Sequence, residues 1–151
     1  MNSEPTPNEV KAFHLVNKVI YGAFLFSLVA YWLAHMFVNV PRAQATGPVA
    51  FPLQEFLPFI AGADALIALY FRFARLGPLL SEVGGDIRRR MNQMRFFYLI
   101  CWVLSESVAL LGFAIPFFTA RLEDAAPYFV GSIALFLLCY PKSPDRPVGL
   151  G

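Results

Sequence analysis

Two carboxylic acids, Asp64 and Glu106, lie in the middle of long apolar segments and are the residues of this sequence best suited to chemistry. A charged side chain at the centre of a bilayer costs about 2.5–3.5 kcal/mol on insertion scales, so its usual interpretation is functional. Asp64 lies eight residues before Arg72, and Glu106 lies eleven residues after Arg95. At a rise of about 1.5 Å per helical residue, we expect the two carboxyl groups to lie within one helical turn of each other in depth.

Such a pair is suited to holding a proton or a cation. An apolar environment favours the neutral form of a carboxyl group, and a second carboxyl group nearby favours it further. We therefore expect the pair to hold at least one proton at neutral pH, or to bind a cation in its place. Ser105 and Ser107 flank Glu106 and are candidate hydroxyl ligands. In the competing interpretation, each acid is protonated, hydrogen-bonds a nearby carbonyl or serine, and only fastens helices together.

Other side chains with catalytic or metal-binding chemistry are poorly placed. The two histidines, His14 and His35, are 21 residues apart on one predicted helix, about 31 Å, so they cannot ligate one metal ion together. No His or Lys base lies near the serines around Glu106. Cys101 and Cys139 lie inside apolar segments and fit small packed side chains better than a disulfide or zinc site. We expect no metal, no cofactor and no catalytic residue, with an intramembrane enzyme acting on lipid as a minor alternative.

The elements that must position these acids follow from the composition. Of the 151 residues, 58% are apolar and 15% are charged, against about 45–50% and about 25% in soluble domains. The apolar residues fall in four blocks, and a helix needs about 17–25 such residues to cross a bilayer. The sequence therefore predicts an all-α membrane protein with one transmembrane domain over residues 14–141. Its four helices form an antiparallel up-down bundle and cover about 15–40, 56–73, 96–118 and 125–140, of which the last is short.

The basic residues predict the orientation, because cytoplasmic segments collect Lys and Arg. Ten of the twelve lie on one side of the four-helix arrangement, and only Arg42 and Arg121 lie on the other. We expect both termini in the cytoplasm, as disordered tails over residues 1–13 and 142–151, and a location in the bacterial inner membrane. The connection between the second and third helices could hold a short surface helix near Gly85–Asn92. Its arginines are expected to contact anionic headgroups or to fix the topology: Arg88, Arg89, Arg90 and Arg95.

The first apolar segment could also be a secretory signal. Ala43-Gln44-Ala45 after that segment has the form of a signal-peptidase site. A secretory apolar region usually has about 7–15 residues, whereas this one is longer. We therefore favour an uncleaved anchor.

Small residues line both acids. They fall at helical spacing, which lets helices approach closely in lipid. This pattern predicts that the acids face protein rather than acyl chains. The residues expected in this packing are Ala61, Ala65, Ala68, Ala109 and Gly112.

The segment from Leu104 to Ile115 resembles the carboxylate helix of the rotary ATPase proteolipids, the subunit c family. In that family an acid lies in mid-helix with a glycine six residues later, as Glu106 and Gly112 do here. The resemblance covers the second and third predicted helices. It implies that Glu106 is the ion-binding carboxylate and that the second helix is its hairpin partner.

Together, these patterns predict a membrane protein that binds a proton or cation at Asp64 and Glu106. It would act as a proteolipid-like ion-translocating subunit. The alternative is a non-catalytic accessory or assembly subunit in which the acids are structural. Membrane lipids and either further copies of the chain or a larger membrane complex are the expected partners. The net charge of +2, with no basic cluster on a soluble face, argues against nucleic acid.

Overall fold

A computed structural model describes residues 6–37, 53–81, 86–119 and 122–142, and almost all of these residues are helical. The predicted signal-peptidase motif at 43–45 lies outside this part of the chain, as do residues 1–5 and 143–151 of the two predicted tails. The elements in chain order are α1 (Pro7–Phe37), α2 (Leu53–Tyr70), the π-helical turn η1 (Phe71–Leu76), α3 (Gly77–Ser81), α4 (Ile87–Ala114), α5 (Pro116–Thr119), the 3-10 turn η2 (Leu122–Ala125) and α6 (Ala126–Leu138).

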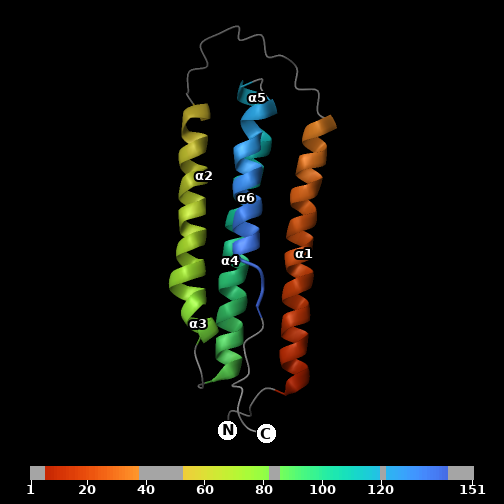
Figure 1. Cartoon of the computed structure of the whole chain (residues 1–151), viewed down its shortest axis with the longest axis vertical. Coiled ribbons are helices and arrows are strands. Elements are labelled where there is room, and N and C mark those ends of the chain that lie inside the picture. The colour runs from red at the N-terminus through yellow and green to blue at the C-terminus, as the bar shows by residue number, and fades with distance from the viewer. Residues whose placement is uncertain (1–5, 38–52, 82–85, 120–121, 143–151) are drawn as a thin grey trace.

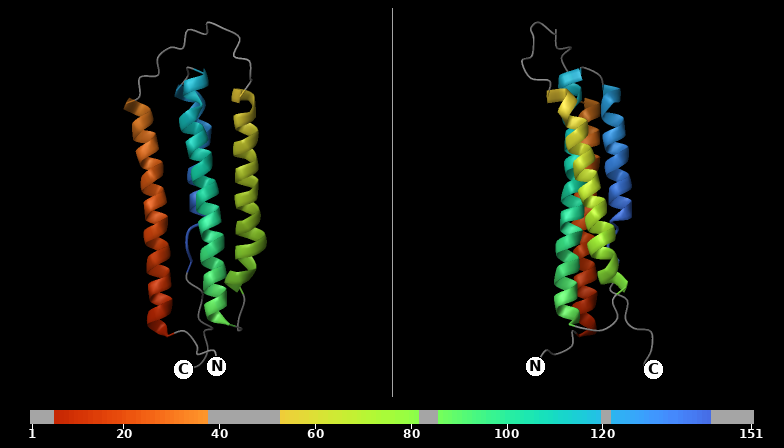
Figure 2. Two further views of the ribbon diagram at one scale, coloured as in Figure 1. Left: turned by 180° about the vertical axis from the view of Figure 1, so that it is seen from behind. Right: turned by 90° about the vertical axis from the view of Figure 1, so that its left-hand side faces the viewer.

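Four of these helices lie side by side along the long axis of the molecule (Figure 1). α4 and α6 lie between α1 and α2, with α6 in front of α4 in Figure 1, and the side view in Figure 2 separates the two. Three helical stretches are long and apolar enough to cross a membrane, namely Pro7–Phe37, Glu55–Ser81 and Ile87–Ala114. The prediction of an all-helical membrane protein is confirmed at this level. α6 has 13 residues and is shorter than these spans.

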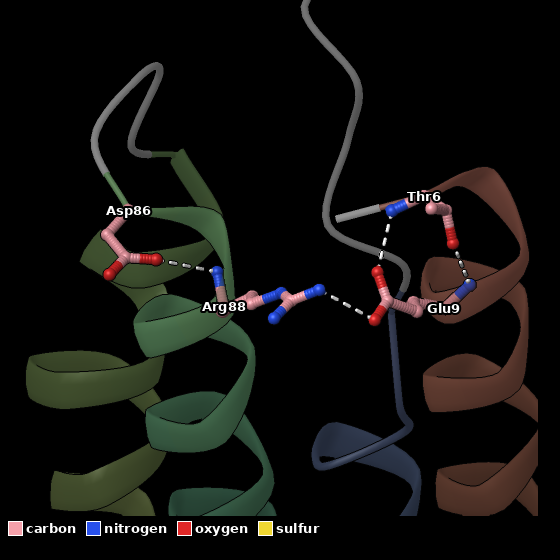
Figure 3. A network of polar contacts seen from close by, with 4 residues as sticks. All are labelled: Thr6, Glu9, Asp86 and Arg88. Atoms are coloured by element: carbon pink, nitrogen blue, oxygen red, sulfur yellow. Dashed lines mark hydrogen bonds and ion pairs between the residues drawn. The ribbon is translucent and has the colours of Figure 1, made fainter. Parts of the chain in front are cut away.

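α1 begins at Pro7, eight residues before the predicted start, so residues 7–13 are helical rather than part of a tail. The reason is a reciprocal capping box. The backbone N–H of Thr6 donates to Glu9 Oε2 at 2.7 Å, and the backbone N–H of Glu9 donates to Thr6 Oγ1 at 3.3 Å (Figure 3). Pro7 adds a preset φ at the first helical position, where its missing N–H is not needed.

α4 also begins earlier than predicted, at Ile87 rather than Phe96. Asp86 is its N-cap, because its Oδ1 accepts the backbone N–H groups of Arg88 at 3.0 Å and Arg89 at 3.2 Å. The short surface helix expected near residues 85–92 is therefore the first part of α4. At the other end, α4 stops at Ala114 and α5 continues from Pro116.

The second helical stretch continues past its predicted end at Phe73 and through Gly77 and Pro78. The π-helical turn makes this possible, since the N–H of Gly77 bonds the carbonyl of Arg72, five residues earlier. Pro78 then lies in the first turn of α3, where its missing N–H costs little.

The buried core is largely supplied by α4. Tyr98 and Trp102 are fully buried, with Phe136 of α6 and Tyr21 of α1 packed around them. Many large apolar side chains point outward instead, and Phe59 is 76% exposed. Apolar surface on this scale is what a lipid-facing bundle presents.

Candidate functional site

Three consecutive residues of α4, Ser105 to Ser107, contact three different helices. Successive residues of an α-helix are about 100° apart around its axis, so neighbours in sequence face different directions. The backbone carbonyl of Ser105 accepts a hydrogen bond from Ser132 of α6 at 2.6 Å. Glu106 bonds α1, and Ser107 bonds α2. This tripeptide therefore connects α4 to the other three long helices.

Glu106 lies between two hydroxyl groups of α1. Its Oε1 is 2.6 Å from Ser27 Oγ and 3.1 Å from the hydroxyl oxygen of Tyr31. Ser27 and Tyr31 are four residues apart and so share one face of α1. The Oγ of Ser27 is also 2.7 Å from the backbone carbonyl oxygen of Phe24.

The contacts of Ser27 constrain the proton on Glu106. A serine hydroxyl carries one proton, and a backbone carbonyl can only accept. When Ser27 donates to Phe24, the 2.6 Å contact to Glu106 is a hydrogen bond only if the carboxyl group carries a proton and donates it to Ser27. When Glu106 is ionised, Ser27 must turn its proton toward the carboxylate and leave the Phe24 carbonyl.

Asp64 has its own partner. Ser107 donates from Oγ to Asp64 Oδ2 at 2.6 Å, across the interface between α4 and α2. The structure thus brings Ser107 and Asp64 together, as the sequence suggested, but gives Asp64 and Glu106 different partners on different helices. Ser105 contacts neither acid, because its hydroxyl donates to the carbonyl of Cys101 at 2.7 Å.

Small residues line the interface beside Asp64. Ala61 and Ala68 are buried in a cluster with Val108 of α4, and Ala65 packs against it. Ala109 is fully buried as well. At Gly112, a Cβ atom would lie 2.5 Å from Cβ of Tyr128 and 3.4 Å from the carbonyl oxygen of Ala125. Only a glycine fits this approach of α4 to the start of α6.

A second polar cluster, absent from the sequence-based prediction, lies at the C-terminal end of α6. Side chains from three other elements donate to its last carbonyls. Tyr21 of α1 donates to Phe136 at 3.2 Å, Arg72 of η1 to Leu138 at 2.6 Å and Trp102 of α4 to Cys139 at 2.9 Å. Because the last carbonyls of a helix have no partner within the helix, these donors let α6 end inside the bundle.

The arginines at the start of α4 pack against α1. Arg88 forms an ion pair with Glu9 at 2.8 Å (Figure 3), and the guanidinium of Arg95 lies 5.2 Å from the centre of the Phe13 ring. Arg90 is buried, and the backbone of Arg89 bonds the capping Asp86. These contacts place the four arginines at one end of the bundle, and their role toward headgroups stays a prediction.

Ser27 and Tyr31 are the site residues that sequence reasoning missed. A signal was present, because Ser27 lies nine residues after Lys18 and so at nearly the depth of Glu106. Tyr31 follows one turn later. His35 is buried and lies 5.9 Å from the Phe129 ring, measured between ring centres. Among the described residues, no group of three or more His, Cys, Asp or Glu side chains is arranged to hold a metal ion.

Comparison of the chain with protein families, with curated proteins and with solved structures found no match.

Proposed function

We propose that this protein is a small integral membrane subunit in which Glu106 binds and releases a proton within the bilayer. The hydrogen-bond geometry of Ser27 carries this proposal. Its two short contacts, to Phe24 and to Glu106, are satisfied together only by a protonated carboxyl group.

Both protonation states of Glu106 have suitable partners. In the neutral state Glu106 donates to Ser27, Ser27 donates to Phe24, and Tyr31 donates to Glu106. In the ionised state Ser27 and Tyr31 both donate to the carboxylate, and hydrogen bonds to an ionised acceptor are about twice as strong as neutral ones. Rotation of one hydroxyl group therefore accommodates both gain and loss of the proton.

A proton fits this site better than a metal cation. Ca²⁺ takes 6–8 oxygen ligands and Mg²⁺ takes an octahedral set. Around Glu106 the described contacts are to two hydroxyl groups, Ser27 and Tyr31. A proton needs only one donor and one acceptor.

The proposed membrane placement has four antiparallel crossings with both termini in the cytoplasm. Lys18 and Arg95 each begin a 20-residue stretch of helix, to Phe37 and Ala114, and Arg72 ends one that starts at Leu53; each is about 30 Å long, which is the thickness of a bilayer core. α6 and η2 together reach about 27 Å. The helix directions visible in Figure 1 support this arrangement, and the basic residues support the cytoplasmic side.

The resemblance to the proteolipid hairpin supports a role in ion translocation, within an oligomer of this chain or a larger complex. The resemblance implies that the second helix is the partner of Glu106, and the hydrogen bonds of Glu106 differ from this expectation. The hydroxyl partners of Glu106 come from α1, whereas α2 contacts the neighbouring Ser107. α1 is therefore part of the proposed proton site.

The proton on Glu106 can be tested directly. Infrared difference spectra of the protein in vesicles, recorded across a pH titration, should contain the C=O stretch of a protonated carboxylic acid. We expect Glu106→Gln to remove that band, while Asp64→Asn leaves it in place. A band that persists in Glu106→Gln would contradict the proposal.

A second function, that of an accessory or assembly subunit, is favoured by the contacts of Ser105, Glu106 and Ser107 with three separate helices. Glu106→Gln and Glu106→Leu distinguish the two functions. Gln keeps groups that can bond Ser27 and Tyr31, whereas Leu keeps none. If the acid only fastens helices, Gln preserves both assembly and proton flux in vesicles, and Leu weakens assembly. If the proton is functional, Gln preserves assembly but abolishes flux.

A further inference from the structure

A basic cavity lies at the end of the bundle where α1 begins. Its volume is about 550 Å³, within the range of small-molecule sites, which is about 300–1,000 Å³. His14 and Lys18 of α1 line one wall, and Leu80 and Ser81 of α3 line another. The segment after α6 completes it with Tyr140, Pro141 and Lys142.

The cavity exists because α6 is short. α6 ends at Leu138, while α1 and α4 continue toward Pro7 and Ile87 (Figure 1). Tyr140 contacts the ring of Tyr21 at 5.5 Å, measured between ring centres. Beyond Leu138 the chain continues as Tyr140, Pro141 and Lys142, which are not helical and line the cavity.

The charged residues that line the cavity are both basic. Lys18 and Lys142 are exposed, and among the described residues that line the cavity none is acidic. The Nδ1 atom of His14 is buried and has no hydrogen-bond partner in the described part of the chain. Buried polar atoms in native proteins nearly always have a partner. These features fit an anionic ligand that supplies hydrogen-bond acceptors.

The position of the cavity indicates the kind of anion. Lys18 lies about 30 Å along α1 from Phe37, one bilayer core away, so the cavity lies at headgroup level. His14, Lys18 and Gly22 share one face of α1 at four-residue spacing. At Gly22 nothing lies within 4 Å of where a Cβ would be, and Val19 beside it is 64% exposed. Space for an acyl chain therefore continues from the cavity along α1.

We propose that this cavity binds the phosphate-containing headgroup of an anionic glycerophospholipid, with an acyl chain lying along the Gly22 face of α1. Basic pockets between transmembrane helices at a membrane surface are suited to such headgroups. The site is separate from Glu106 and does not depend on the proton-binding proposal.

Trp102 offers a local probe, since its ring lies 5.7 Å from that of Tyr21, which touches Tyr140. Trp32, the other tryptophan, is removed by Trp32→Phe. The Trp32→Phe protein is reconstituted in phosphatidylcholine vesicles that contain either brominated phosphatidylglycerol or brominated phosphatidylcholine. We expect stronger quenching of Trp102 by the phosphatidylglycerol, and equal quenching by both would overturn the proposal.

Matched variants separate the cavity from general surface charge. A basic residue near the membrane surface contributes about a fivefold preference for anionic lipid, so Lys18→Gln with Lys142→Gln should weaken the preference about thirtyfold. Lys11→Gln with Arg75→Gln removes the same charge from exposed residues that do not line the cavity, and should weaken the preference much less than the cavity double variant does. An equal loss in both double variants would refute a specific site.

Soluble anions provide the last arm of the test. Inorganic phosphate and glycerol 3-phosphate are added to the same vesicles. If neither restores the fluorescence of Trp102, the occupant is the lipid, as proposed. If either compound restores the fluorescence of Trp102 at a concentration similar to that of phosphatidylglycerol in the sample, the cavity is a site for a free phosphate compound and the lipid proposal fails.

Discussion

Gly112→Ala is the substitution whose effect the structure specifies most closely. The added Cβ would lie 2.5 Å from Cβ of Tyr128, whereas carbon atoms pack at about 3.5–4.0 Å. Because the obstructing atom is a Cβ close to the backbone, α6 itself must shift. Such overpacking costs about 1–3 kcal/mol, and replacing a helical glycine by alanine returns about 0.5–1 kcal/mol. The net loss lies between about 0 and 2.5 kcal/mol, so the free energy of unfolding should fall by about 1 kcal/mol.

The assay is a denaturant titration in detergent micelles, followed by tryptophan fluorescence. Gly131→Ala on α6 is the matched control, since nothing lies within 4 Å of where its Cβ would be. That variant gains helix propensity without a clash and should be as stable as wild type or more so. If Gly112→Ala unfolds at the same denaturant concentration as Gly131→Ala, the close approach of α4 and α6 at this position is refuted.

Three further predictions follow from the contacts described above. Arg72→Leu should lower the free energy of unfolding by about 0.5–1.5 kcal/mol in the same titration, because the carbonyl of Leu138 loses its donor at the end of α6; an unchanged free energy would show that this hydrogen bond does not stabilise the protein. Thr6→Ala should weaken the N-cap of α1 by about 0.5–2 kcal/mol, measured as faster amide exchange in its first turn, and unchanged protection there would argue against the capping box. Cys101 and Cys139 are fully buried and should react with a maleimide only after unfolding, so rapid labelling of the native protein would contradict their placement.

The sequence was sufficient to predict the long helices. Runs of apolar residues between basic residues located three of the membrane spans, because the bilayer requires that length of helix. The contact between Ser107 and Asp64 fits the predicted side-by-side packing of their helices. Both helix starts that were placed too late had readable caps, namely Thr6 with Glu9 and Asp86.

The sequence did not predict which face of each helix packs against which neighbouring helix. Depth follows from counting residues, but the direction in which a side chain points depends on which neighbour the whole helix packs against. Asp64 and Glu106 lie at similar depth on adjacent helices, yet Glu106 turns to α1 because Ser107, the next residue, faces α2. A single step along α4 is enough to give the two acids hydrogen-bond partners on different helices.

This separation changes how the two acids can work. A carboxylate pair in contact would share a proton, and its titration would belong to the pair. Here each acid has hydroxyl partners of its own, Ser107 for Asp64 and Ser27 with Tyr31 for Glu106. Fastening helices and binding a proton are then compatible roles for Glu106, provided that Ser27 can donate either to Phe24 or to the carboxylate. In the proposed function, Tyr31 donates to Glu106 in both protonation states, and Ser27 keeps its own contact between α1 and α4 after loss of the proton only by turning its hydroxyl group, which makes Ser27 part of the proposed site.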